Sequence, residues 1–243
     1  MSVTAAVRAR RVSKWSAYAS AMCWIVGSVA VLLFYALEVP ASLAGETKPH
    51  IFGPLSDYAS LLQFVCLLPL PLTLRQVPSS SQRTPVAVAA LGVSGALLGA
   101  IAQALLLMGV IGVEVNIPLI IGALALLGGW MLLASRRARS DGFLSAWLAR
   151  VGAFTGASFA LVVSLALVML LAAALTPGAL TNLGAFLQGA PALIGVAIVA
   201  IIPAALAYFF GVPIWLIGLG RRLRSSRAAA QLDLQQTPLG SRQ

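Results

Sequence analysis

The chain has 243 residues, of which 60% are hydrophobic and only 9% are charged. In soluble domains about a quarter of the residues are charged, so this composition excludes an ordinary soluble fold. The formal net charge of +10 does not indicate a nucleic-acid partner, because the basic residues lie in short clusters beside apolar runs and form no basic domain. We therefore predict a protein of the lipid bilayer that also contacts anionic headgroups on the cytoplasmic side.

The hydrophobic residues form six runs, each long enough to cross a hydrocarbon core, which takes about 20 helical residues. We predict an all-α membrane protein, a bundle of six transmembrane helices within residues 18–219. A basic segment, residues 1–17, precedes the bundle. Residues 220–243 form a basic and then Gln-rich tail that we expect to be disordered. The predicted spans cover residues 18–37, 58–74, 86–110, 116–133, 151–175 and 192–219.

The first run follows a basic segment, an arrangement that a cleaved signal peptide also has. Its apolar stretch is about 20 residues long, whereas the apolar region of a signal peptide has roughly 7–15. Five further runs follow it in the sequence. We therefore predict that residues 18–37 form an uncleaved first span.

The second predicted span begins with a polar edge. Asp57 falls in its expected first turn, where a carboxylate complements the helix dipole, and Ser56 is the predicted N-cap. Ser60 and Gln63 continue the edge into the outer half of the span. These residues form either an ordinary helix start or one wall of a polar pocket.

The third predicted span carries a stripe of small residues that ends in a glutamine. At about 100 degrees per residue, Gly92, Gly95, Gly99 and Gln103 fall within one narrow sector of the helix. Small residues let a second helix approach closely, and a glutamine on the same face can hydrogen-bond across the contact. We predict that the stripe packs against another helix rather than lipid. Gln103 lies at a depth similar to that of Gln63, which allows a contact between them, and a substrate-facing role for Gln103 is the alternative.

Asn116 is the predicted N-cap of the fourth span, with Pro118 in its first turn. Between the fifth and sixth spans, residues 176–191 are uncharged and carry apolar residues at helical spacing. This connection is either a short interfacial helix or an apolar loop.

Prolines interrupt two of the predicted spans. Each removes a backbone hydrogen bond, so we predict a kink or local unwinding at these positions. Broken helices line the central sites of many transporters, but proline is also common in membrane helices. The residues concerned are Pro69 and Pro71 in the second span and Pro203 and Pro213 in the sixth.

The sign of the charge alternates from one predicted connection to the next. Basic residues flank the cytoplasmic ends of the spans, whereas Glu38, Glu46, Asp57 and Glu114 fall on the opposite side. Because Lys and Arg hold short loops in the cytoplasm, both termini are predicted to be cytoplasmic. Fourteen arginines against two lysines indicate a GC-rich bacterial genome, and hence the bacterial plasma membrane.

The chemistry available within the spans is limited. No Asp, Glu, Lys, Arg or His falls at the middle of a span, which argues against ion-coupled transport. The sequence has no serine-hydrolase, zinc-protease or phosphate-loop motif. Cys23 and Cys66 fall at different depths, and His50 is the single histidine, so no His/Cys metal constellation is formed. We assign no catalytic, cofactor-binding or metal-binding residue and expect no cofactor.

Three functions stay open. The first is a non-enzymatic membrane component, accessory, regulatory or assembly-related, which acts through helix contacts with a membrane-protein partner or a second copy. The second is a small permease for an uncharged or apolar solute, in which Asp57, Ser60, Gln63 and Gln103 converge on one outward-open pocket. The third is an integral-membrane enzyme. A cavity between the second, third and sixth spans would favour the permease.

Overall fold

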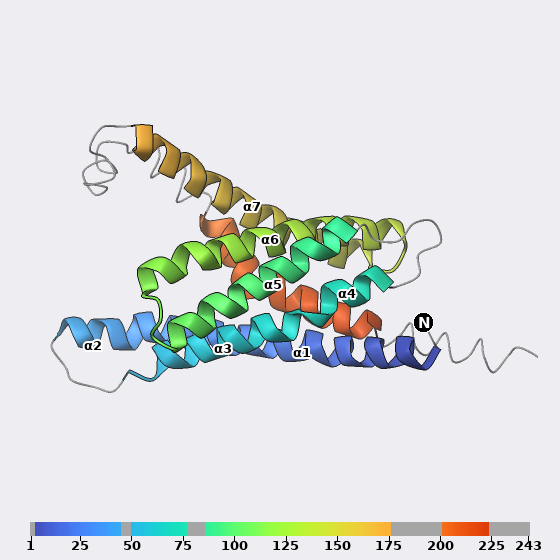
Figure 1. Cartoon of the computed structure of the whole chain (residues 1–243), viewed down its shortest axis with the longest axis horizontal. Coiled ribbons are helices and arrows are strands. Elements are labelled where there is room, and N and C mark those ends of the chain that lie inside the picture. Colours follow the sequence, from blue (N-terminus) through green and yellow to red (C-terminus); the bar gives the residue numbers. More distant parts are fainter. Residues whose placement is uncertain (1–2, 45–49, 77–85, 176–200, 224–243) are drawn as a thin grey trace, which may run out of the picture.

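The computed structural model describes residues 3–44, 50–76, 86–175 and 201–223. The regular structure in this part of the chain is entirely helical (Figure 1) and includes six helices that are long and apolar enough to cross a membrane. The prediction of an all-α fold with six such helices is confirmed. The connection at 176–191 and the tail beyond residue 223 lie outside the described residues.

The helices follow one another with only short connections among the described residues. The first candidate span is a continuous rod of three labelled elements, and the second is broken once near its middle. In chain order the elements are α1 Val3–Leu33, the π-helix η1 Phe34–Glu38, α2 Val39–Leu43, α3 Phe52–Leu67, α4 Pro69–Gln76, α5 Val86–Leu107, α6 Val113–Ser140, α7 Ala146–Leu175 and the π-helix η2 Ala207–Gly211, which lies inside the final helix Ile201–Leu223.

The spans form a closed ring. α1 lies along α3, α3 packs against α5, α5 against α6 and α6 against α7, while the final helix contacts both α7 and α1. The last contact includes the rings of Trp24 and Tyr208, whose centroids are 4.9 Å apart. Trp24, Trp130 and Trp215 are fully buried in the core. Trp130 and Trp215 meet edge to face with their centroids 5.4 Å apart, which joins α6 to the final helix.

The outer surface of the bundle is largely apolar. Between 33% and 44% of the residues in each candidate span are buried, so most of them face outward. Large apolar side chains more than 40% exposed occur on all six spans, for example Val29, Leu62, Ile101, Leu133, Leu161 and Ile202. A helix that is hydrophobic on all sides suits lipid rather than water. Six candidate membrane-spanning helices with such a surface suggest a multi-pass membrane protein.

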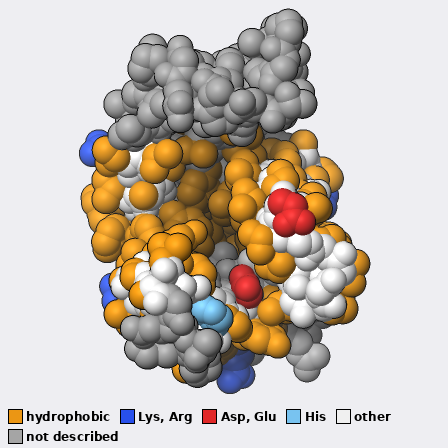
Figure 2. Space-filling model, turned by 90° about the vertical axis from the view of Figure 1, so that its left-hand side faces the viewer, with side chains coloured by type: hydrophobic (Ala, Val, Ile, Leu, Met, Phe, Trp, Pro, Cys, Tyr) orange, Lys and Arg blue, Asp and Glu red, His pale blue; other side chains and the backbone are white. Residues whose placement is uncertain are grey.

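Charges separate toward the two ends of the bundle. One end of the bundle, which we call the basic end, contains the starts of α1 and α7 and the ends of α4, α6 and the final helix (Figure 1). Asp141 also lies at this end. Glu38, Asp57 and Glu114 belong to the opposite, acidic end. Figure 2 looks onto the acidic end and shows acidic side chains and the histidine within a largely hydrophobic face, with Lys and Arg only at its margins.

Both predicted N-caps are wrong. α3 begins at Phe52, so Ser56 is not its N-cap and Asp57 lies beyond its first turn. α6 begins at Val113 with extended Gly112 as N-cap (φ −83°, ψ 170°). Asn116 therefore lies inside the helix, where it is buried, and Pro118 lies beyond the first turn. Both helices start earlier than the apolar runs do, because their first turns protrude beyond the most hydrophobic stretch.

The third span also ends earlier than predicted, at Leu107 instead of residue 110. Gly109 adopts a φ of +69°, which only glycine does without strain. Its N–H donates to the carbonyl of Leu106, and the N–H of Val110 donates to the carbonyl of Leu105 at 2.9 Å. These bonds close the helix end as a Schellman motif.

The predicted break in the second span is confirmed at Pro69. Proline has no N–H to offer the carbonyl of Val65, and that carbonyl accepts instead from the N–H of Leu68 at 3.3 Å. Serines of α1 add hydroxyl donors along the same stretch. Ser20 donates to the carbonyl of Gln63 at 3.1 Å and Ser16 to that of Cys66. Hydroxyl groups of α1 thus add hydrogen bonds to backbone carbonyls close to the break.

The two π-helices have the same relation to a following proline. η1 ends at Glu38, two residues before Pro40, and η2 ends at Gly211, two residues before Pro213. In each case the residue before the proline donates its N–H five residues back, from Val39 to Phe34 and from Val212 to Ala207. The wider turn makes room for a ring that would otherwise clash with a carbonyl. Distortion near Pro213 was predicted and is confirmed, whereas that near Pro40 was not foreseen.

Candidate functional site

The residues of the predicted polar edge take part in contacts between helices. Ser60 and Gln63 are buried on α3, 9% and 2% exposed. The Ser60 hydroxyl lies near Gly27 of α1, while the backbone carbonyl of Gln63 accepts from Ser20. Asp57 is only half-buried. On α5, Gln103 is 6% exposed.

Gln103 forms a hydrogen bond with Asn116, which was predicted to cap the start of the fourth span. Its Oε1 accepts from Nδ2 of Asn116 on α6 at 3.5 Å, a long hydrogen bond. Among the described hydrogen bonds, none joins Gln103 to Gln63. The Ser60 hydroxyl and the backbone carbonyl of Gln63 therefore lie at the α1–α3 interface, whereas the Gln103 amide lies at the α5–α6 interface.

The glycine stripe of α5 lies against three other helices. A Cβ added at Gly99 would lie 2.5 Å from the ring of Phe64 on α3, and one at Gly95 would lie 2.9 Å from backbone atoms of α6. A Cβ at Gly92 would lie 2.6 Å from Pro71 on α4 and 2.7 Å from Trp130 on α6. All three glycines are buried. Their role in this structure is to let neighbouring backbones approach closely.

A second set of close glycine contacts joins α7 to its neighbours. A Cβ at Gly156 would lie 2.4 Å from the carbonyl oxygen of Gly128 on α6. One at Gly152 would lie 2.3 Å from Nε1 of Trp215 on the final helix. Sequence reasoning missed these contacts, although Gly152 and Gly156 have the four-residue spacing that often marks close helix packing.

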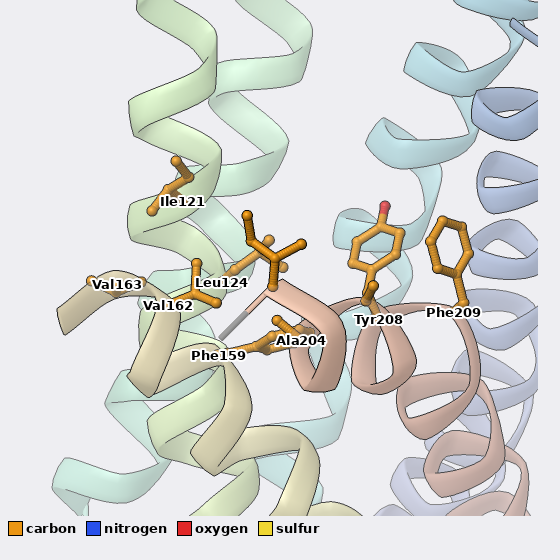
Figure 3. Close-up of a pocket in the computed structure, with 10 residues that line it drawn as sticks. Ile121, Leu124, Phe159, Val162, Val163, Ala204, Tyr208 and Phe209 are labelled. Atoms are coloured by element: carbon orange, nitrogen blue, oxygen red, sulfur yellow. The ribbon is translucent and has the colours of Figure 1, made fainter. Parts of the chain in front are cut away.

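Immediately beyond the crossing of Gly128 and Gly156, on the side of the acidic end, α6, α7 and the final helix enclose a pocket of about 270 Å³ (Figure 3). Every lining side chain is a hydrocarbon except that of Tyr208, whose ring carries one hydroxyl. The lining residues are Ile121 and Leu124 of α6, Phe159, Val162 and Val163 of α7, and Ile201, Ala204, Ala205, Tyr208 and Phe209 of the final helix.

The pocket lies beside the close crossing of α6 and α7. Where Gly128 crosses Gly156, the two backbones are in contact. One turn further along, α6 carries Leu124 and α7 carries Phe159, which is 5% exposed. Phe159 packs directly against Gly128, since a Cβ added there would lie 2.8 Å from its Cβ. Beyond this contact, Figure 1 shows α7 diverging from α6 toward its C-terminal end. The wide turn of η2 then supplies Tyr208 to the opposite wall.

The pocket does not coincide with the predicted one. Asp57, Ser60, Gln63 and Gln103 are absent from its lining, and it lies between the fourth, fifth and sixth spans instead of the second, third and sixth. It also lacks converging polar groups, so its walls can offer contact surface and shape but few directional hydrogen bonds. Among the described residues, no three His, Cys, Asp or Glu side chains are grouped so that they could hold a metal ion.

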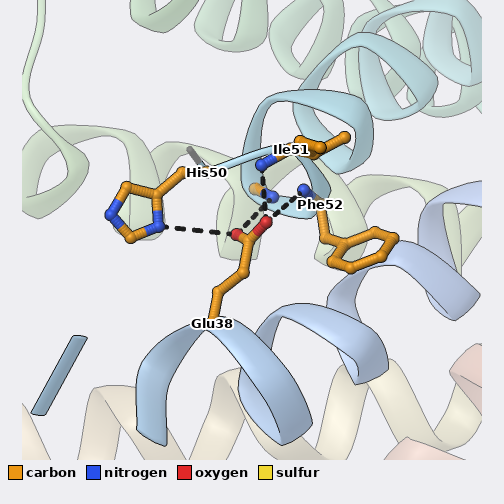
Figure 4. Close-up of polar contacts among 5 residues, drawn as sticks. Glu38, His50, Ile51 and Phe52 are labelled. Atoms are coloured by element: carbon orange, nitrogen blue, oxygen red, sulfur yellow. Dashed lines mark hydrogen bonds and ion pairs between the residues drawn. The ribbon is translucent and has the colours of Figure 1, made fainter. Parts of the chain in front are cut away.

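At the acidic end, Glu38 closes the start of α3 (Figure 4). Its carboxylate accepts hydrogen bonds from the backbone N–H groups of Ile51 at 2.5 Å and Phe52 at 2.8 Å, and from Gly53 at 3.4 Å. The imidazole Nδ1 of His50 lies 3.7 Å from the same carboxylate. The first N–H groups of a helix have no partner within the helix and attract negative charge. Glu38, at the end of η1, therefore caps the start of α3 and places a negative charge there, the roles that were predicted for Ser56 and Asp57.

Comparison with known proteins gives no relative: no family model, no curated protein and no solved structure matches the chain.

Proposed function

We propose that the chain is a six-span protein of the bacterial plasma membrane with both termini in the cytoplasm. The separation of basic and acidic side chains to opposite ends of the bundle supports this orientation. Reporter fusions after residues 80, 140 and 230 are expected to read cytoplasmic, and fusions near residues 46 and 182 external. A C-terminal fusion that reads external would contradict the proposal.

Within the membrane we propose a non-enzymatic component that acts through contacts between helices in an accessory, regulatory or assembly role. The observation that carries this proposal is the use of the polar side chains. Gln103 bonds Asn116, Ser20 bonds the backbone beside the break in the second span, and Glu38 closes a helix start. Side chains engaged in this way hold the bundle together and leave few groups to act on a substrate.

The partner of such a component is a second membrane protein or a second copy of the chain, with anionic lipid headgroups at the basic end. The test is purification of the full chain in mild detergent, with measurement of mass and composition of the complex by light scattering and mass spectrometry. A stoichiometric second membrane protein, or a defined homo-oligomer, is the expected result. A chain that is monomeric in nanodiscs as well as in detergent would contradict the proposal.

A second candidate function is a permease for an uncharged or apolar solute, and the pocket beside η2 favours it. π-turns inside helices are frequent at functional sites, and η2, which also accommodates Pro213, supplies Tyr208 to the pocket wall. If the pocket lies on a transport path, Ala204→Trp should abolish uptake of the solute in proteoliposomes. Gln103→Leu, which lies outside the pocket, should leave uptake intact and lower only stability.

A further inference from the structure

We propose that the pocket between α6, α7 and the final helix binds one acyl chain of a membrane lipid. The inference rests on the membrane placement proposed above. Its starting point is the position of the pocket along the spans. Leu124 lies eleven residues after the start of α6, which is about 16 Å at 1.5 Å per residue. Twelve residues separate it from Arg136 on the other side. The pocket is therefore near the middle of a hydrocarbon core of about 30 Å.

Water is a poor occupant of this space. A buried water needs two to four polar partners, and an apolar cavity of about 150 Å³ lined by similar residues stays dry and binds benzene or xenon. The present pocket measures about 270 Å³ and has the Tyr208 hydroxyl as its single polar side-chain group. Left empty, its walls would lack dispersion contacts on one side. Hydrocarbon is the filling that suits these walls.

The shape and surroundings favour a chain of methylene groups over a protein segment. A helix with its side chains is about 10–12 Å across and does not fit between three helices in a space of this size. The pocket is open on one side, and Ile201, one of its lining residues, is 57% exposed. At this depth the molecules at highest concentration are lipid tails, which need no polar partner. An acyl chain can enter from the side while its headgroup stays at the interface.

The test uses the full chain in vesicles of phosphatidylethanolamine and phosphatidylglycerol that contain a phospholipid with a diazirine in the middle of one acyl chain. After illumination, adducts are located by mass spectrometry. We expect adducts at Val162 and Tyr208 in clear excess over those at Ile101, an exposed side chain of α5 outside the pocket. Ala204→Phe, which fills the pocket, should reduce the adducts at Val162 and Tyr208 to the level at Ile101.

Two variants serve as controls. Ala90→Phe makes the same change at an exposed position of α5 and should leave the pocket adducts unchanged. Ala205→Phe fills the pocket from a neighbouring position, should Ala204→Phe fail to fold. Equal labelling of the pocket and Ile101 would overturn the inference, as would cross-linking of the pocket to a second polypeptide. If alkaline washing removes the chain from the vesicles, the membrane placement itself fails, which is a different result from an inserted protein with an unlabelled pocket.

Discussion

Replacing Gly95 by alanine adds one methyl group where α5 and α6 are in backbone contact. An ideal Cβ at this position would lie 2.9 Å from both the carbonyl oxygen of Ala123 and the backbone nitrogen of Leu127. Backbone atoms of a packed helix cannot move aside singly, so the two helices must separate. We expect the cost of an overpacked core, about 1–3 kcal/mol.

Gly122→Ala on the facing helix is the matched control. Its Cβ would lie 3.6 Å from the nearest atom of Leu98, an ordinary contact. Both variants replace a helical glycine and gain the same helix propensity, roughly 0.5–1 kcal/mol. The difference between them therefore isolates the steric cost of about 1–3 kcal/mol. This corresponds to a ratio of roughly 5 to 150 between their unfolding equilibrium constants.

The measurement is reversible unfolding in mixed micelles by added SDS, followed by tryptophan fluorescence and by helical circular dichroism. A second pair of variants enlarges the effect. Gly95→Leu should lower stability or expression far more than Ser94→Leu, because Ser94 is exposed. If Gly95→Ala proves as stable as Gly122→Ala, the close contact between α5 and α6 does not exist and the packing described here is wrong.

Two further predictions concern the polar contacts. A double-mutant cycle with Gln103→Leu and Asn116→Leu should give a coupling free energy of about 0.6 kcal/mol, the average for hydrogen bonds between membrane helices; a value near zero in the same SDS titration would show that the amides do not bond. Glu38→Gln weakens the closure of the α3 start, so the amide hydrogens of Phe52 and Gly53 should exchange faster with solvent, whereas Glu114→Gln should leave their exchange rates unchanged.

The six spans could be predicted from sequence because each depends on one local property, a run of apolar residues that meets the length of a membrane core. The break at Pro69 was predictable for a similar reason, since a missing N–H acts on the same helix. The rotational grouping of Gly92, Gly95, Gly99 and Gln103 also follows from helix geometry alone. Which helices these residues would meet does not follow from it.

The helix starts were predicted wrongly because their determinants lie outside the apolar runs. α3 is closed by Glu38, which belongs to the preceding span and lies thirteen residues before Ile51. Gln103 meets Asn116 across the α5–α6 interface, and the short turn that joins these helices contains Gly109 at positive φ. The residue pattern within one span shows neither which distant residue caps a helix nor which residues of two helices meet.

The pocket depends on still more distant relations, since three helices must meet at particular angles before it exists. The crossing of Gly128 and Gly156 lies next to it, and Leu124 and Phe159 belong to its walls. The same crossing therefore holds α6 and α7 together toward the basic end and separates them toward the acidic end. Because the pocket needs three helices to meet in this arrangement, no pattern within one span predicts it.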